Sequence, residues 1–383
     1  MVAAGAAVLV KLVPIPYVTV IAIIGVVAGF FLHAPQPLPL THSFILFVLL
    51  PGLLFEAGFN LQWTHLRGNL WSISLLATAG VILTAALVAL LGHAALGLAL
   101  PMAILFGAMV APTDPVAVVA VFRKLQVPAR LANLVEGESL LNDGTGVVLF
   151  TIALAAVAAG HFQPLPAIWD FVRLSLGGLA LGAGLGFLIS LLTARIDDPQ
   201  VEITFTAVAA YGGYLLGETL HVSGILTVVA AAIVLGSYGR ERGMSERTQQ
   251  AVGVFWDYVA FLLNAVVFLL IGLALPWQGV IAQGWVVLAG ALIVLLARAA
   301  MVYGTFGLLR PLGRTVNLQW QHVIVWSGIR GAVAVALALS LGSRGGQFGL
   351  VQSLVYGVAL LTIVIQGLTI TPLCLALFRR RST

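Results

Sequence analysis

Charged side chains are scarce in this sequence. Asp, Glu, Lys and Arg together make up 8% of the 383 residues, against about 25% in a typical soluble domain. So few charges cannot cover the surface of a soluble protein. The shortage therefore excludes a cytosolic globular enzyme, a nucleic-acid-binding domain and a disordered chain. A polytopic membrane protein remains, with the lipid bilayer as a partner and no nucleic acid.

Cysteine is almost absent, because Cys374 is the only one in the chain. A single thiol excludes an internal disulfide framework and a metal site built from clustered cysteines. The seven histidines show no metal-ligand spacing. No glycine-rich loop is followed by Lys and then Ser or Thr, so a pump driven by ATP hydrolysis on this chain is also excluded.

Long hydrophobic runs fill the chain instead, and hydrophobic residues make up 61% of it. A bilayer span needs about 17–25 mainly apolar residues. The candidate segments are 1–12, 16–33, 41–59, 69–92, 101–124, 130–160, 167–194, 199–217, 221–239, 247–275, 279–309, 317–342 and 349–378. The sequence thus predicts an all-α polytopic protein of about 13 transmembrane helices, the first of them short. We expect residues 1–383 to form one transmembrane domain without a soluble regulatory domain.

The basic residues divide unequally between the two sides that these segments define. Fourteen of the 18 Lys and Arg residues fall in alternate connections, and only Arg344 falls in the others. The remaining three, Arg173, Arg298 and Arg330, lie within spans. Because basic loops face the cytoplasm, we expect a cytoplasmic C-terminus.

Two stretches in the fifth and twelfth segments resemble each other. Residues 114–121 read Asp-Pro-Val-Ala-Val-Val-Ala-Val, and residues 330–337 read Arg-Gly-Ala-Val-Ala-Val-Ala-Leu. Seven segments separate them, so the two copies would have opposite orientations, as in an inverted-topology repeat. A chance likeness between two helices rich in Val and Ala explains the similarity equally well.

Both stretches contain residues that break helices. Pro112 and Pro115 lie on either side of Asp114, and Gly328 and Gly331 lie on either side of Arg330. Proline removes a backbone N–H and clashes with the preceding turn. Broken helices at matching positions indicate a binding site near the middle of the membrane.

Several polar side chains lie inside the sixth segment, where burial in lipid is costly. Glu138 and Asn142 are four residues apart, as are Ser139 and Asp143. The two pairs therefore form neighbouring tracks on one helical stripe. Oxygen atoms that converge in this way suit a small hard cation, and hydrogen bonding between helices is the alternative.

The two predicted breaks carry charges of opposite sign. Asp114 can offset the positive end of a half-helix, and this role without ion contact is as well supported as a role in an ion site. Thr113 can offer its hydroxyl or a freed carbonyl to an ion. Arg330 needs a buried counter-charge, for which Glu138 is the favoured partner and Glu56 or Asp114 the alternatives. Glu56 either joins the ion site or lines an inner funnel.

The other polar residues within spans have local explanations. Arg298 is expected to extend its side chain to the inner interface. Asp170 and Arg173 are expected to form an i,i+3 pair. Asp257 and Asn264 are interpreted as structural residues that cap or bridge helices.

Taken together, the motifs resemble those of sodium/proton exchangers. Residues 111–118 and 137–144 look like the two signature motifs of that family. Residues 255–273 and 326–333 resemble two further family segments, in the expected order. The likeness covers nearly the whole chain and is closest to the NhaP-like branch of the monovalent cation/proton antiporters, which is related to the animal exchangers.

The resemblance implies a fold with two inverted six-helix units and two crossed broken helices, assembled as a homodimer in a prokaryotic plasma membrane. It implies secondary antiport of a monovalent cation, Na⁺ or Li⁺ and next K⁺, against protons by an elevator-like movement. No cofactor and no enzymatic activity are expected.

The resemblance also transfers the family's ion site onto this sequence. Asp143 matches the central carboxylate, where a proton and the cation would compete. Its implied neighbours are Ser139, Thr113, Asp114 and, as a further ligand, Glu56. The residues implied as Na⁺ ligands are Asp143, Ser139, Thr113 and Glu56. Glu138 and Arg330 match a buried ion pair. Asn142 stands where the electrogenic branch has Asp, which favours electroneutral exchange.

Two other functions would use the same acids. A passive cation channel needs a continuous pore, and broken helices around one midplane site argue against it. An intramembrane aspartyl hydrolase would use Asp114 and Asp143 as an acid pair. The sequence lacks the second catalytic Asp-Gly pairing in a matching helix that such an enzyme needs.

Overall fold

The structure is a computed structural model that describes residues 16–32, 42–61, 63–273, 277–312, 315–342 and 346–378. The predicted short segment 1–12 and Arg344 lie outside these residues. Helices make up most of the described chain, and no strand occurs in it. The predicted all-α class is confirmed.

The helices follow one another with short connections. They are α2 (Tyr17–Leu32), α3 (His42–Phe44), α4 (Leu50–Asn60), α5 (Trp63–Arg67), α6 (Leu70–Leu75), α7 (Val81–Leu96), α8 (Leu100–Val110), α9 (Val116–Leu125), α10 (Ala129–Ala159), α11 (Pro164–Thr193), α12 (Pro199–Ala207), α13 (Gly213–Thr219), α14 (Gly224–Val234), α15 (Arg240–Arg242), α16 (Glu246–Leu273), α17 (Trp277–Ala282), α18 (Gly284–Leu309), α19 (Leu318–Trp326), α20 (Ala332–Ser340) and α21 (Gln347–Phe378). Wider π-helical turns join some of them end to end: η1 (Ile45–Leu49), η2 (Leu76–Gly80), η3 (Val208–Gly212) and η4 (Leu235–Gly239). A 3₁₀ turn, η5 (Arg310–Leu312), follows α18.

Seven helices of the described chain are long and apolar enough to cross a membrane. They are Leu70–Leu96, Ala129–Ala159, Pro164–Thr193, Gly224–Arg242, Glu246–Leu273, Gly284–Leu309 and Gln347–Phe378. The other five predicted segments after the first are also helical, but they are shorter or interrupted. The total of 13 spans remains a prediction.

Both predicted helix breaks are present. Between α8 and α9, residues 111–115 are not helical, and between α19 and α20 the same holds for residues 327–331. The backbone N–H of Asp114 donates to the carbonyl oxygen of Ile329 over 2.7 Å. The two breaks therefore contact each other, although they lie more than 200 residues apart in the sequence. The inverted relation of the two halves remains a prediction.

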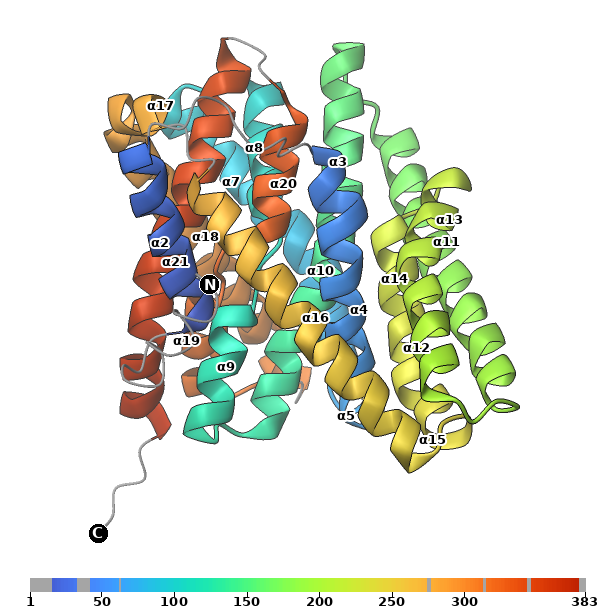
Figure 1. The fold of residues 1–383 in the computed structure, drawn as a ribbon. Coiled ribbons are helices and arrows are strands. Elements are labelled where there is room, and N and C mark those ends of the chain that lie inside the picture. Colours follow the sequence, from blue (N-terminus) through green and yellow to red (C-terminus); the bar gives the residue numbers. More distant parts are fainter. Residues whose placement is uncertain are drawn as a thin grey trace.

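Helices α11 to α15 form one side of the bundle, and α14 packs against α4 (Figure 1). Small residues allow α11 and α14 to approach closely, because a Cβ on Gly182 or Gly186 would collide with the backbone of Thr227 or Ala231. On the other side, α7, α8, α18 and α21 pack together. The long helix α16 runs diagonally across the front and contacts both α2 and α4 (Figure 1).

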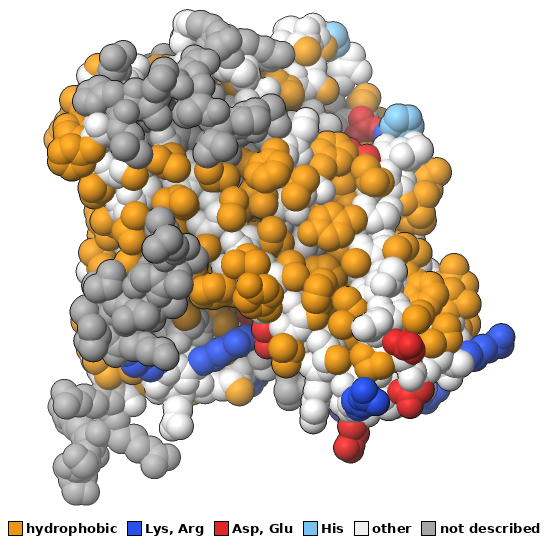
Figure 2. Space-filling view, viewed as in Figure 1, with side chains coloured by type: hydrophobic (Ala, Val, Ile, Leu, Met, Phe, Trp, Pro, Cys, Tyr) orange, Lys and Arg blue, Asp and Glu red, His pale blue; other side chains and the backbone are white. Residues whose placement is uncertain are grey.

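The surface has the distribution expected of a bilayer-spanning bundle. Figure 2 shows apolar side chains over most of the visible face, with charged side chains gathered mainly along the lower edge, near α9 and α15. We call this end of the bundle, where α9 (Val116–Leu125) and α15 (Arg240–Arg242) lie, the charged edge. At the opposite end of α11, Arg173 and Asp170 form the predicted i,i+3 ion pair, with 3.5 Å between nitrogen and oxygen.

Candidate functional site

Two half-helices begin at the crossing of the breaks, and both direct backbone N–H groups at Asp114. Val116, at the start of α9, donates to Asp114 Oδ1 over 3.0 Å. Ala332, at the start of α20, donates to Asp114 Oδ2 over 3.4 Å. The carboxylate therefore offsets the positive ends of two helix dipoles, as predicted for one. Both of its oxygens are engaged in this role.

Two other half-helices end at the crossing, and each is capped by an arginine. Arg330 Nη1 donates to the carbonyl oxygens of Ala111 (2.5 Å) and Pro112 (3.0 Å), just beyond the end of α8. Arg298 Nη2 donates to the carbonyl of Ile324, in the last turn of α19, over 3.2 Å. Positive charge at a helix C-terminus is stabilising. Charges of the appropriate sign thus compensate all four helix ends.

The buried ion pair differs from the predicted one. Glu138 pairs with Arg298, with Nη1 2.5 Å from Oε1 and Nη2 2.9 Å from Oε2. The two side chains are 1% and 4% exposed. The prediction that Glu138 pairs with Arg330 is therefore wrong, and so is the prediction that Arg298 extends to the interface. Arg298 points into the core, where it pairs with the Glu138 carboxylate and donates to the last turn of α19. Arg330 instead donates to carbonyl oxygens at the end of α8.

Helix α10 presents two different polar faces at the breaks. On the buried face, Asn142 and Thr113 form reciprocal hydrogen bonds: Thr113 N–H donates to Asn142 Oδ1 (3.1 Å), and Asn142 Nδ2 donates to Thr113 Oγ1 (2.8 Å). The Ser139 hydroxyl donates to the Thr113 carbonyl. These contacts fix the first break against α10. The sequence predicted that the polar stripe of α10 converges on one ion. This prediction is wrong for Asn142 and Glu138, because their polar groups are hydrogen-bonded to other protein groups.

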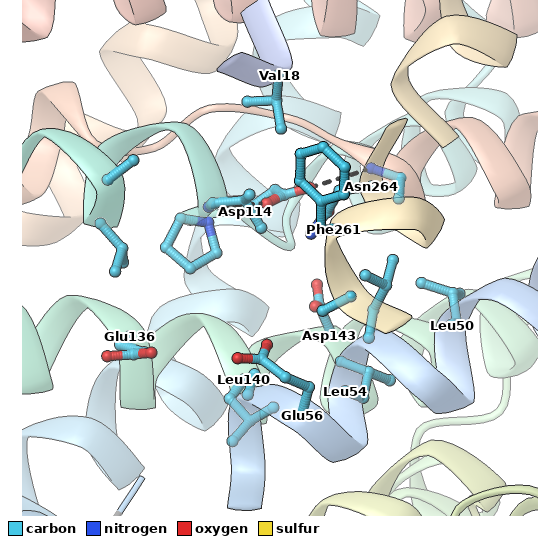
Figure 3. A pocket seen from close by; sticks show the side chains of 18 of the residues that line it. Val18, Leu50, Leu54, Glu56, Asp114, Glu136, Leu140, Asp143, Phe261 and Asn264 are labelled. Atoms are coloured by element: carbon cyan, nitrogen blue, oxygen red, sulfur yellow. Dashed lines mark hydrogen bonds between the residues drawn. The ribbon is translucent and has the colours of Figure 1, made fainter. Parts of the chain in front are cut away.

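The other polar face of α10 lines a cavity of about 400 Å³. Glu136, Leu140 and Asp143 recur at helical spacing along this wall. The carboxylates in the lining come from four different parts of the chain, and Figure 3 shows Glu56, Asp114, Glu136 and Asp143 around the same space. The acidic lining residues are Glu56, Asp114, Glu136, Asp143 and Asp257. Among the described residues, the basic side chain of Arg123 also lines it.

Asp143 is distinctive among the acids near the breaks. Within the described residues its carboxylate has no hydrogen-bond or ion-pair partner, and it lies close enough to Asp114 for the two charges to interact. Asp114 and Glu138, in contrast, have backbone or guanidinium partners. Asp143 is half-buried, so its ionised form would be a poorly solvated negative charge that a cation or a proton entering the cavity could neutralise.

Glu56 projects from α4 into the same cavity. Its Oε1 accepts a hydrogen bond from Asn60 Nδ2 over 2.7 Å. The Asn60 amide also donates to Asp257 over 3.4 Å, which joins α4 to α16 and confirms the predicted bridging role of Asp257. Arg123, at the end of α9, is exposed and lines the cavity. The cavity therefore extends from the helix breaks towards the charged edge.

Sequence reasoning missed three polar lining residues. Glu136 is not among the predicted site residues, although its helical spacing to Leu140 and Asp143 places it on the same face of α10. Asp257 and Asn264 are predicted to have structural roles only, but both line the cavity. The amide oxygen of Asn264 is buried without a partner among the described residues. Thr113 and Ser139 are not lining residues. Both side chains are buried, and the Ser139 hydroxyl is hydrogen-bonded to the Thr113 carbonyl.

The sequence is similar to those of known sodium/proton antiporters over most of its length. A family profile described as "Sodium/hydrogen exchanger, transmembrane" matches residues 1–376. The Na⁺/H⁺ antiporter ApNhaP of Aphanothece halophytica is 39% identical over 360 residues, which cover 93% of this chain and 68% of that protein. The Na⁺/H⁺ antiporter NhaP of Pseudomonas aeruginosa is 37% identical over 337 residues, covering 85% of this chain and 78% of that protein.

A solved structure has the same overall fold. The sodium proton antiporter MjNhaP1 from Methanocaldococcus jannaschii superposes with a TM-score of 0.81 at 20% sequence identity. The superposition covers 98% of this chain and 95% of the other. The arrangement of helices is thus shared nearly from end to end.

Proposed function

Because this chain belongs to the sodium/hydrogen exchanger family, a family of transporters rather than enzymes, we propose that it exchanges a monovalent cation for protons across a membrane. Na⁺ is the first candidate cation, followed by Li⁺ and K⁺. One observation carries the proposal. Asp143 is the carboxylate beside the crossed breaks that lines the cavity and has no hydrogen-bond or ion-pair partner among the described residues.

The charges around the crossing support a single exchangeable site. Asp114 and Glu138 carry two negative charges, and Arg298 and Arg330 carry two positive charges. All four are held by helix ends or by each other. Their formal charges cancel. Asp143 is then the remaining charge, and binding of one proton or one monovalent cation makes the cluster neutral.

Competition for Asp143 couples the two fluxes. A carboxylate that holds a proton cannot also bind the cation well, so each ligand has to leave before the other binds. Because the cation needs the deprotonated group, its apparent affinity rises with pH until Asp143 is fully ionised. No cofactor takes part in this cycle.

Thr113 and Ser139 are proposed as additional cation ligands. In the structure Ser139 lies one helical turn before Asp143 on α10, and its hydroxyl donates to the Thr113 carbonyl. A cation at Asp143 could replace that hydrogen bond and draw one oxygen from each residue. Glu56 and Asp114 complete the proposed ion and proton pathway, because both line the same cavity.

Movement of the site between the two sides of the membrane is proposed to be elevator-like. The cavity is open towards the charged edge, and that edge is proposed to be cytoplasmic because basic loops favour that side. The C-terminus then lies on the same side. The protein is proposed to act as a homodimer in a prokaryotic plasma membrane.

Reconstitution into sealed proteoliposomes tests the proposal. An outward Na⁺ gradient should acidify the lumen, as read by a trapped pH-sensitive dye. Asp143→Asn should abolish this signal, because the nearly isosteric amide cannot exchange a proton. The matched control is Asp170→Asn, which removes a carboxylate from an exposed ion pair and should retain transport. Exchange at near wild-type rate in Asp143→Asn would refute the proposed site, and Na⁺ flux without proton flux would indicate a channel.

A further inference from the structure

A second pocket lies at the charged edge, away from the cavity that contains Asp143. Its volume is about 430 Å³. It lies between α5 on one side and η4 and α15 on the other. Figure 1 shows α5 and α15 at the lower end of the bundle. The polar and aromatic lining residues include Trp63, Arg67, Tyr238, Arg240, Glu241 and Arg242. None of these residues takes part in the proposed exchange cycle.

The pocket concentrates positive charge. Among the described lining residues three are arginines and one, Glu241, is acidic, which gives these residues a formal excess of two positive charges. None of the three guanidinium groups forms an ion pair with a carboxylate of the described residues. Arg240 Nε is buried without a hydrogen-bond partner in this part of the chain. Glu241 in the lining and Asp257, which acts on Arg240, offset only part of this positive charge, so an anionic ligand in the pocket would be attracted to the remainder.

Aromatic rings hold two of these arginines in place. The guanidinium of Arg240 lies 4.5 Å from the centre of the Phe59 ring, and that of Arg242 lies 5.1 Å from the centre of the Tyr238 ring. Such stacking orients a planar guanidinium and leaves its N–H groups free to donate sideways. The planar fork of N–H groups matches the oxygens of a phosphate.

We propose that this pocket binds a phosphate group, supplied by the headgroup of an anionic lipid. Its location at the charged edge places it at the level where lipid headgroups lie. Basic pockets between helices on the cytoplasmic side are a recurrent form of headgroup site. Trp63 is 47% exposed beside it, which is typical of aromatic residues at the membrane interface. Ile233 and Val234 provide an apolar wall. Free phosphate has the same chemistry and is distinguished by the experiment.

The test compares two double variants that each remove two positive charges from the charged edge. Arg67→Gln with Arg242→Gln alters the pocket. Arg195→Gln with Arg247→Gln is the control, because both residues are exposed and neither lines the pocket. Native mass spectrometry of purified protein would measure binding of phosphatidylglycerol, with phosphatidylcholine as the neutral lipid. Each arginine in contact with the phosphate should contribute about fivefold to binding.

The pocket variant lacks two of these arginines and should therefore bind phosphatidylglycerol about 25-fold more weakly than wild type, with phosphatidylcholine binding unchanged. The control should bind like wild type. Displacement of the lipid by millimolar inorganic phosphate would support the pocket and identify free phosphate as a competing source, whereas persistence of the lipid would identify the headgroup as the ligand. Equal retention in both double variants, or equal loss in both, would overturn the proposal.

Discussion

Two ion pairs of the same chemical type occupy opposite environments in this protein. Glu138 and Arg298 are almost fully buried, whereas Asp170 and Arg173 are about half exposed. Removing one partner of a buried pair leaves an uncompensated charge in a low dielectric, which costs about 3–5 kcal/mol. An exposed pair contributes about 0–1 kcal/mol. Removing one partner should therefore destabilise the protein much more at the buried pair than at the exposed pair.

Glu138→Gln should lower the unfolding temperature in detergent much more than Asp170→Asn does. Arg298→Gln should behave like Glu138→Gln, because it also releases the last turn of α19. Thermal unfolding monitored by intrinsic tryptophan fluorescence would measure both effects. Equal melting temperatures for the buried and exposed variants would show that the Glu138–Arg298 contact does not stabilise the fold.

The sequence predicted the residues of the site better than their partners. Burying an acidic residue in a membrane span is costly, so such residues are candidates for a function. Asp114, Glu138 and Asp143 could be predicted as site residues on this ground. Their partners depend on tertiary packing, and Glu138 and Arg298 are 160 residues apart. The spacing on α10 showed a polar stripe but not which part of it faces the cavity. Asn142 was therefore grouped with Asp143, although its amide is bonded to Thr113.

At the scale of helices, the crossing of the two breaks depends on a close approach at Gly331. A Cβ at this position would collide with the Asp114 carboxylate. Gly304, inside α18, is a suitable contrast because a Cβ there would meet nothing within 4 Å. The same substitution at the two positions therefore separates crowding at the crossing from the general effect of replacing glycine in a membrane helix.

Gly331→Ala should displace Asp114 from the N-terminus of α20, lower the unfolding temperature and strongly reduce exchange. Gly304→Ala should leave exchange intact and change stability by less than about 1 kcal/mol, with stabilisation expected from the better helix propensity of alanine. Melting curves and proteoliposome transport would be measured on the same preparations. Normal transport in Gly331→Ala would contradict the proposed role of the crossing.

Helix-scale features were largely readable from the sequence. Prolines 112 and 115 predicted the first break, because each removes a backbone donor, and glycines 328 and 331 predicted the second. Apolar runs located the helices because lipid requires them. The direct contact between the breaks, through Asp114 and Ile329, was not predictable from local sequence because it joins segments more than 200 residues apart.

At the scale of the whole molecule, the balance of fixed charges determines the voltage dependence of transport. If Asp143 carries one proton in one direction and one monovalent cation in the other, no net charge crosses the membrane. A membrane potential acts on each net elementary charge with about 2.3 kcal/mol per 100 mV. The final extent of Na⁺/H⁺ exchange in proteoliposomes should therefore be unchanged when a potassium–valinomycin potential is imposed. A voltage-dependent shift would show that a second acid, such as Glu56, also carries a proton.

The overall architecture was predictable because membrane burial constrains it strongly. Alternating basic connections indicated which helix ends share a side, and Arg67, Arg123 and Arg240 belong to α5, α9 and α15, which lie near the same edge in Figure 1. The cavity was not predictable, since its lining combines residues of α2, α4, α9, α10, α16 and α20. Its shape depends on how these helices pack.

The central claim is that a proton and a cation compete for Asp143, and proton release on cation binding tests it most directly. Na⁺ would be added to purified protein in weakly buffered solution, and the released protons would be counted with a pH indicator. The wild type should release about one proton per bound Na⁺ at a pH where Asp143 is protonated, and in that range its apparent Na⁺ affinity should rise about tenfold per pH unit. Asp143→Asn should release none. Proton release from Asp143→Asn equal to that of the wild type, or Na⁺ binding to the wild type without proton release at any pH, would contradict the account.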